Sequence, residues 1–214
     1  MIAKGEPWGE PATEPPELEV AGDDAALAAA VSAARGALVH FIPSGSEVAR
    51  AVGLEGESAG ALAVPLDALQ TDDGVVAVNM VVAGPAPDRV RWWHRRVACR
   101  VTVDDRVTFA GQAVSVLIAN GQFLRGRDVV PRGHPGDGRA EVQVYALTPG
   151  ERASMRRRLV SGEHVPHPRI SQSRGQRVVV SFGRRRRLEV DGHDHGRRQT
   201  LTVTVVPAAL RILV

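Results

Sequence analysis

The sequence predicts a mainly β protein with a small α/β part, in which a short strand-helix-strand-helix segment precedes an antiparallel β-sandwich. Two observations indicate this class. In the second half, apolar and polar residues alternate in the runs RVTV, EVQVYAL and TLTVTVV, as in antiparallel strands with one covered face. The first half instead carries short apolar strands separated by capped helices, which is typical of a parallel α/β layer.

The chain is expected to divide into three parts. Residues 1–17 are rich in Glu and Pro without periodicity and are expected to form a flexible lead-in. Residues 18–73 are assigned to the α/β part and residues 74–214 to the β-sandwich. With 214 residues, 43% of them hydrophobic and 24% charged, the chain is expected to be soluble and globular.

Helix caps predict the elements of the α/β part. Asp23 is suited to be the N-cap of an alanine-rich helix, and Ser46 is suited to cap a second, shorter one. Gly36 and Gly53 follow these helices and are expected to end them. The expected strand, helix, strand and helix lie at residues 18–20, 24–34, 38–42 and 47–52.

Strands dominate the second half. They are expected at residues 75–82, 97–103, 107–109, 113–119, 141–147, 177–182, 188–190 and 201–206. The capping box from Thr148 to Glu151 predicts one helix that ends near Val160. The strands at 113–119 and 201–206 are expected to be central, because both are apolar enough to be buried on two sides. Asp191-Gly192 is expected to form the turn of the closing hairpin.

Charge is distributed unevenly along the chain. Residues 1–90 hold 4 basic and 14 acidic side chains, whereas residues 91–214 hold 23 basic and 10 acidic ones. Lys4 is the only lysine and lies in the expected lead-in. A Walker-type phosphate loop with its lysine is therefore excluded from the folded part, and phosphate binding would require Arg or backbone N–H groups.

Composition also bears on location. Cys99 is the only cysteine and cannot form an internal disulfide, and neither a signal core nor an apolar run of about 20 residues is present, so we expect a cytoplasmic protein that crosses no membrane. The run RWWHRR predicts peripheral contact with an anionic membrane surface at the inner face. The residues assigned to that surface are Arg91, Trp92, Trp93, Arg95 and Arg96. The alternative is one core Trp among solvated Arg side chains.

Aromatic residues are only 4% and no nucleic-acid motif is present, so no nucleic-acid partner is expected.

Several short motifs follow one another in a recognisable order. They are AGDDA at 21–25, PSGSEVARAVGL at 43–54, Asn79 with Gly84, Asn120-Gly121, Asp137-Gly138, Asp191-Gly192-His193 and the run 207–214. The series resembles the GGDGT, P-x-G-T-x-N-D, N-x-x-x-x-G, NG, P-x-A-x-x-x-D-G, DGE and P-x-A-L-x-[VI] motifs of the bacterial diacylglycerol kinase and sphingosine kinase-like lipid kinases of the NAD kinase-like superfamily. The resemblance implies the β-sandwich of that family, preceded by an α/β remnant truncated at its N-terminus.

Departures from the family pattern bear on activity. Asp24 and Ala25 replace a glycine and the threonine of the phosphate loop, which adds a carboxylate where a nucleotide would bring negative charge. His193 stands in the place of the Glu that resembles the family's base. The resemblance implies catalytic positions at Asp191 and His193. It implies ligand-binding positions at Gly45, Ser46, Asn79, Asn120 and Asp137. Simple turn chemistry at Asp191 and helix capping at Asp24 remain the alternatives.

The sequence thus predicts a lipid kinase-like protein with a degenerate nucleotide site. It is expected to be a non-kinase or very weak kinase that binds a lipid or amphipathic molecule in the inter-domain cleft, without a cofactor. One alternative is an active lipid kinase that uses Mg-ATP and is completed by another chain, for example in a homo-oligomer. Another is a β-sandwich interaction module for an acidic partner. Asp191, His193 and His195 also fit a D-x-H-x-H pattern, but local spacing supplies no full ligand set, so no metal site is expected.

Overall fold

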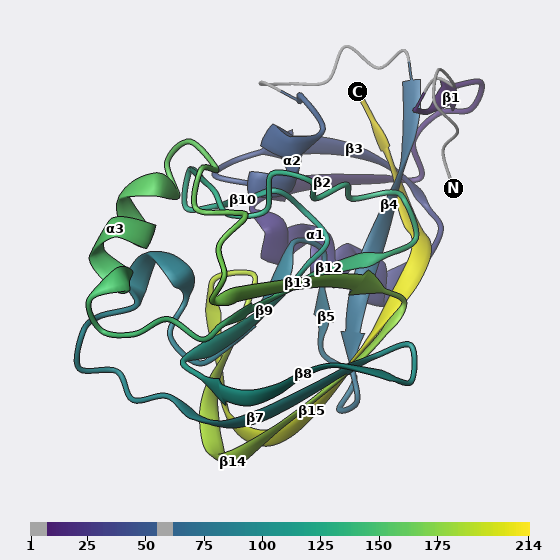
Figure 1. Cartoon of the computed structure of the whole chain (residues 1–214). Coiled ribbons are helices and arrows are strands. Elements are labelled where there is room, and N and C mark those ends of the chain that lie inside the picture. The colour runs from purple at the N-terminus through teal and green to yellow at the C-terminus, as the bar shows by residue number, and fades with distance from the viewer. Residues whose placement is uncertain (1–7, 55–61) are drawn as a thin grey trace.

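The computed structural model describes residues 8–54 and 62–214. Its helices are α1 (Asp24–Ala33), α2 (Glu47–Ala51) and α3 (Glu151–Arg158), with a 3₁₀ turn η1 (Pro87–Arg89). Its strands are β1 (Glu10–Pro11), β2 (Leu18–Gly22), β3 (Leu38–Pro43), β4 (Leu62–Thr71), β5 (Val76–Ala77), β6 (Met80–Ala83), β7 (Val97–Val103), β8 (Arg106–Ala113), β9 (Ser115–Ala119), β10 (Phe123–Leu124), β11 (Arg127–Asp128), β12 (Ala140–Tyr145), β13 (Ile170–Gly175), β14 (Arg177–Val190) and β15 (His193–Leu213). Figure 1 shows α2, β2 and β3 at one end of the molecule and β7 and β8 at the other, with β15 running from one end to the other.

The antiparallel part is built on the long hairpin β14–β15. β14 pairs with β7 along its first half and with β6 at its end, and the sheet continues through β9 and β12 to β13. Alternate residues Leu201, Val203 and Val205 of β15 are buried in the core between the layers. This arrangement confirms the predicted fold class. β9 lies between β6 and β12, and β15 lies between β14 and β4, so both strands expected to be central are central. β9 is buried on both sides as expected, whereas the expectation is wrong for 201–206, where Thr204 is exposed and only alternate side chains are buried.

β15 also connects the antiparallel part to the α/β part. Its residues 203–213 pair with β4, and Arg211 and Ile212 pair in parallel with β3. The sheet therefore continues into residues before Gly74, and β1, within the expected lead-in, pairs with β4. β4 was not predicted, because Pro65 and Asp67 interrupt the apolar alternation of its sequence. Residues 1–7 of the expected lead-in lie outside the described residues.

The α/β part forms as its caps predict. The Asp23 side chain accepts the N–H groups of Ala25 and Ala26 at the start of α1, and the Ser46 hydroxyl accepts the N–H of Ala49 at the start of α2. β2 and β3 pair in parallel. The apolar side of α1 packs with β3, β4 and the end of β15 in a second core. The end of β14 and its turn consequently lie beside α1.

Three expected strands are divided or joined in the structure. The segment 75–82 is divided into β5 and β6, because its central N–H groups bind the Asp191 carboxylate instead of a neighbouring strand. The segments 177–182 and 188–190 are joined in the single strand β14, with register shifts between them. β13 was not predicted. None of the helices in the described ranges has the length and hydropathy needed to span a membrane.

Candidate active site

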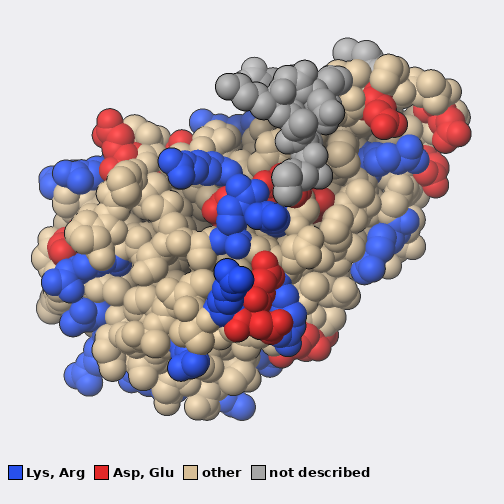
Figure 2. All heavy atoms as spheres, turned by 45° about the vertical axis from the view of Figure 1, so that its right-hand side comes forward, with Lys and Arg blue, Asp and Glu red and all other residues tan. Residues whose placement is uncertain are grey.

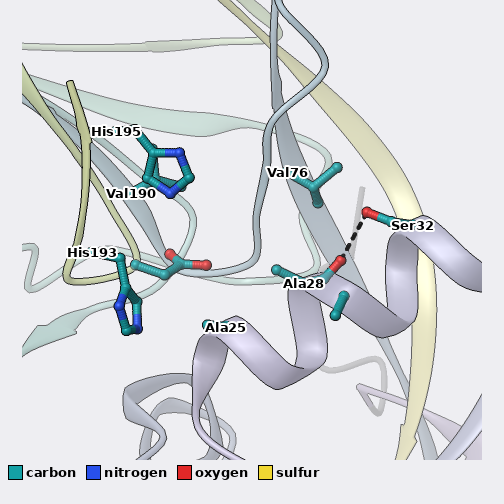
Figure 3. Close-up of a pocket in the computed structure, with 9 residues that line it drawn as sticks. Ala25, Ala28, Ser32, Val76, Val190, His193 and His195 are labelled. Atoms are coloured by element: carbon teal, nitrogen blue, oxygen red, sulfur yellow. Dashed lines mark hydrogen bonds between the residues drawn. The ribbon is translucent and has the colours of Figure 1, made fainter. Parts of the chain in front are cut away.

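A small pocket lies where α1 meets the turn between β14 and β15. Its volume is about 250 Å³. It is lined by Ala25, Ala28, Ala29 and Ser32 of α1, by Val76, and by Val190, Asp191, His193 and His195 around the turn. Figure 3 shows the two histidines on the opposite side of the pocket from the helix residues. The lining therefore joins an apolar wall of small side chains to a polar wall of imidazole and carboxylate groups.

The turn of the closing hairpin has two residues. Val190 pairs with His193, so Asp191 and Gly192 alone connect the strands. Their φ angles are 44° and 85°. Positive φ at both central residues is the requirement of a type I′ turn, for which Asp-Gly is a preferred sequence. The predicted turn is confirmed, and it sets His193 directly beside α1.

The Asp191 carboxylate binds backbone rather than pointing freely into the pocket. Its Oδ2 accepts the N–H of Val78 at 2.8 Å, and its Oδ1 accepts the N–H groups of Asn79 and Met80 at 3.1 and 2.8 Å. Burial raises the pKa of Asp191 to about 7, against the effect of these hydrogen bonds, and the nearby Asp24 carboxylate raises it further. Asp191 thus holds the loop between β5 and β6 in position.

Asp24 lies inside the molecule beside this loop. It is 5% exposed, and its Oδ1 accepts the Ser46 hydroxyl at 2.6 Å and the Val48 N–H at 3.1 Å. Burial raises the pKa of Asp24, although these two hydrogen bonds favour the charged form. Asp24 thus connects the start of α1 to the start of α2, a contact that its position in the sequence did not indicate.

His193 is the polar group most open to the pocket. Its side chain is 58% exposed, and its Nε2 lies 3.7 Å from Oδ2 of Asp23. A carboxylate beside an imidazole orients the ring. This arrangement can accept a proton or a hydrogen bond from a hydroxyl group bound in the pocket.

Asn79 and Asn120 lie next to this network but are closely packed. Asn120 is fully buried, and its amide donates to the carbonyls of Asp67 and Val78 at 2.8 and 2.9 Å. Asn79 is 2% exposed and donates to the carbonyl of Phe123 at 3.1 Å. Their contacts join the loop between β5 and β6 to β10, and the loop after β9 to β4.

The remaining predicted ligand positions lie outside the pocket lining. Gly45 precedes the cap of α2, with open space where a Cβ would lie. Asp137 forms an ion pair with Arg174 at 2.6 Å. The catalytic and ligand-binding roles of all seven predicted residues stay predictions.

Asp67 is a buried carboxylate that sequence reasoning missed. It is 2% exposed and accepts the N–H groups of Gly138 and Ala208 at 2.6 and 2.9 Å. Burial raises its pKa. Its signal in the sequence is a single acidic residue in the otherwise apolar run LAVPLDAL. Asp67 joins the loop before β12 to the bulge in β15.

The segment 91–96 is displayed on the surface. Trp92 and Trp93 are 71% and 56% exposed and meet edge to face with ring centroids 5.5 Å apart, so neither is a core residue. The buried Arg152 of α3 donates to the backbone carbonyls of Arg91, Trp92 and His94. Contact of this segment with a membrane remains a prediction.

Charges of both signs lie close together on the face shown in Figure 2, where basic groups lie in separate clusters with carboxylates beside several of them. The sequence imbalance between the two halves therefore does not produce one continuous basic surface there. Across the described ranges 8–54 and 62–214, His, Cys, Asp and Glu side chains form no group of three or more arranged to hold a metal ion.

Comparison with known proteins gives one family match and several similar folds. Residues 86–214 match the family described as "YegS C-terminal NAD kinase beta sandwich-like domain". A candidate diacylglycerol kinase from Bacillus anthracis str. Sterne has a TM-score of 0.75 and 13% identity, with 92% of this chain and 78% of that chain covered.

A crystal structure of a diacylglycerol kinase from the same organism has a TM-score of 0.68 and 13% identity, covering 92% and 76% of the two chains. Yeast NADH kinase in complex with NADH has a TM-score of 0.50 and 12% identity, covering 92% and 62%. At these identities the likeness shows the fold alone. No curated protein matches the chain.

Proposed function

Because this chain belongs to the family of YegS C-terminal NAD kinase β-sandwich-like domains, within the diacylglycerol and sphingosine kinase-like part of the NAD kinase-like superfamily, we propose a function derived from that of a lipid kinase. The protein is a non-kinase or very weak kinase. It binds a lipid or other amphipathic molecule in the pocket between α1 and the β14–β15 turn.

Carboxylates that bind the N–H groups at the starts of α1 and α2 support the loss of kinase function. Helix N-termini bind phosphate because their N–H groups are free and the local potential is positive. Here the Asp23 carboxylate accepts the first N–H groups of α1, and Asp24 accepts the N–H of Val48 at the start of α2. These N–H groups are therefore already bound to carboxylates and are not free to bind the phosphate of a nucleotide.

The lining of the pocket supports the binding of a lipid or other amphipathic molecule. Ala25, Ala28 and Val76 offer a hydrocarbon surface, whereas the imidazoles of His193 and His195 lie across from the helix residues (Figure 3). A molecule with an apolar part and a hydroxyl group satisfies both walls, and the hydroxyl would donate to the imidazole of His193. At about 250 Å³ the pocket accepts one end of a lipid, not a whole one.

Titration with Mg-ATP tests the loss of kinase function. We expect a dissociation constant weaker than about 100 µM, which corresponds to about −5.5 kcal/mol. The variant His193→Glu is expected to transfer no labelled phosphate to diacylglycerol, because the loop carboxylates remain. Tight Mg-ATP binding by the parent, or transfer by the variant, would instead support the working-kinase alternative.

Native mass spectrometry of the purified protein tests ligand binding. Ala29 is exposed and lines the pocket, so Ala29→Trp should fill the pocket without changing the core. Ala33→Trp places the same side chain at an exposed position of the same helix, outside the lining. We expect a bound amphipathic mass in the parent and in Ala33→Trp, and its loss in Ala29→Trp. Equal occupancy in both variants would place the ligand outside this pocket, and no bound mass in the parent would favour the interaction-module alternative.

A further inference from the structure

A second pocket, of about 560 Å³, lies at the other end of β6 from the Asp191 turn. Its lining comes from two segments far apart in the sequence, the loop after β6 and the hairpin β14–β15. We call it the arginine pocket. It is lined by Gly84, Pro85, Ala86, Arg89, Arg91, Trp93, His94, Arg186, Arg187, Glu189 and Arg197. Its residues are distinct from those of the pocket described above.

Positive charge in the arginine pocket is only partly compensated. Glu189 is its one carboxylate, and this group pairs with Arg89 at 3.5 Å and, outside the lining, with Arg125 at 2.7 Å. Arg187 pairs with Asp194 at the surface. No carboxylate of the described residues lies within 4.0 Å of the guanidinium nitrogens of the other three lining arginines. These are Arg91, Arg186 and Arg197.

The pairing register of β14 and β15 adds to this excess of positive charge. Arg187 and Arg197 are direct partners across β14 and β15. Like charges at directly opposite positions destabilise a sheet unless an anion lies between them or nearby. Asp194 compensates the charge of Arg187 only, so a bound anion would compensate the charge of Arg197.

Arg186 is held in the wall of the pocket. One terminal nitrogen donates to the carbonyl of Val114, and its Nε is buried with no hydrogen-bond partner. A Cβ at Gly84 would lie 3.1 Å from a terminal nitrogen of Arg186 and 2.7 Å from the Val114 carbonyl, so only glycine leaves room for this placement. A guanidinium fixed in this way has lost side-chain freedom before any ligand binds.

We propose that the arginine pocket binds the phosphate group of a phosphate monoester. Guanidinium groups present planar pairs of donors that match phosphate oxygens, and a monoester carries nearly two negative charges at neutral pH. Trp93 forms an aromatic side of the pocket, with the more exposed Trp92 against it. A monoester with an apolar part can place that part on these indoles, as a phospholipid does at headgroup depth. This site does not rest on the function proposed above.

The test compares a pocket variant with a matched control. Arg91→Gln with Arg197→Gln removes two exposed arginines of the pocket, and leaves Arg186 in place. The control, Arg100→Gln with Arg106→Gln, removes the same charge from exposed positions of β7 and β8. Circular dichroism should give all three proteins the same folded spectrum, and removal of Arg197 from its place opposite Arg187 should not lower the unfolding midpoint.

Two probes distinguish the sources of the phosphate. One is glycerol 3-phosphate by calorimetry. The other is co-sedimentation with phosphatidylcholine vesicles that contain phosphatidic acid, compared with vesicles of equal charge made with phosphatidylglycerol, a diester. We expect binding to at least one monoester probe. It should be weakened at least about tenfold in the pocket variant, which is the factor for the loss of a single charge-assisted hydrogen bond, and unchanged in the control.

Each outcome decides the proposal. Binding to the soluble ester assigns the site to a free phosphate compound, and binding to phosphatidic acid vesicles alone assigns it to a lipid headgroup. No binding in either arm overturns the proposal. An equal loss in both variants, or equal binding to the two vesicle types, also overturns it, because general charge attraction would then explain the result.

Discussion

Replacement of Asp191 by Asn should change how stability depends on pH. The substitution keeps the shape of the side chain, and Asn tolerates the positive φ of 44° at this position. Its amide oxygen can keep the hydrogen bonds from Asn79 and Met80. Its amide nitrogen would face the N–H of Val78, which now donates to Oδ2 at 2.8 Å. We estimate the cost of that lost hydrogen bond at about 2 kcal/mol at any pH.

In the parent protein, the buried carboxyl group of Asp191 also lowers the free energy of unfolding by an amount that depends on pH. Burial raises the pKa of Asp191 from its ordinary value of 3.8 to about 7. Above pH 4 the unfolded chain releases this proton, whereas the folded protein keeps it until about pH 7, so stability falls as pH rises through that range. Between about pH 5 and pH 8 this linkage removes roughly 2.5 kcal/mol from the parent. The Asn variant has no such group.

The linkage has already cost the parent roughly 1.6 kcal/mol by pH 5, so the variant should be about as stable as the parent there, and more stable than the parent by about 2 kcal/mol near pH 8. Urea unfolding followed by circular dichroism at both pH values measures this difference. Asp67 titrates in both proteins, so its effect largely cancels in the comparison, whereas Asp24 interacts with Asp191 and its contribution is part of the measured difference. A difference that stays constant with pH would refute the assignment of a raised pKa to Asp191.

Two further outcomes are expected. Ser46→Ala should lower the free energy of unfolding by about 2 to 4 kcal/mol, because it removes the cap of α2 and a hydrogen bond to the buried Asp24 carboxylate. The control Ser32→Ala, an exposed hydroxyl that bonds within α1, should cost well below 1 kcal/mol, and equal losses would show that the Asp24 contact contributes nothing. Arg95→Glu with Arg96→Glu should reduce co-sedimentation with anionic vesicles, and at about 0.5 M salt, where the Debye length is roughly 4 Å, only binding anchored by the indoles should persist. Unchanged vesicle binding by this double variant would remove the segment 91–96 from any membrane contact.

The sequence by itself determined the features that depend on near neighbours. Asp23 and Ser46 cap helices whose N–H groups lie two and three residues away. The turn at Asp191-Gly192 follows from the conformational preferences of two adjacent residues. The alternation in 200–206 predicted which side chains of β15 are buried. The motif order also predicted the family, to which the match over residues 86–214 now assigns the chain.

Only the tertiary structure decided how these pieces meet. The carboxylate of Asp191 binds the N–H of Val78, 113 residues earlier, and this contact divides a strand that its apolar pattern had predicted to be continuous. Arg91 and Arg197 line one pocket although they lie in different segments of the chain. Periodicity and capping report forces between residues a few positions apart, whereas strand pairing, burial of charge and the walls of a pocket depend on segments that only folding brings together.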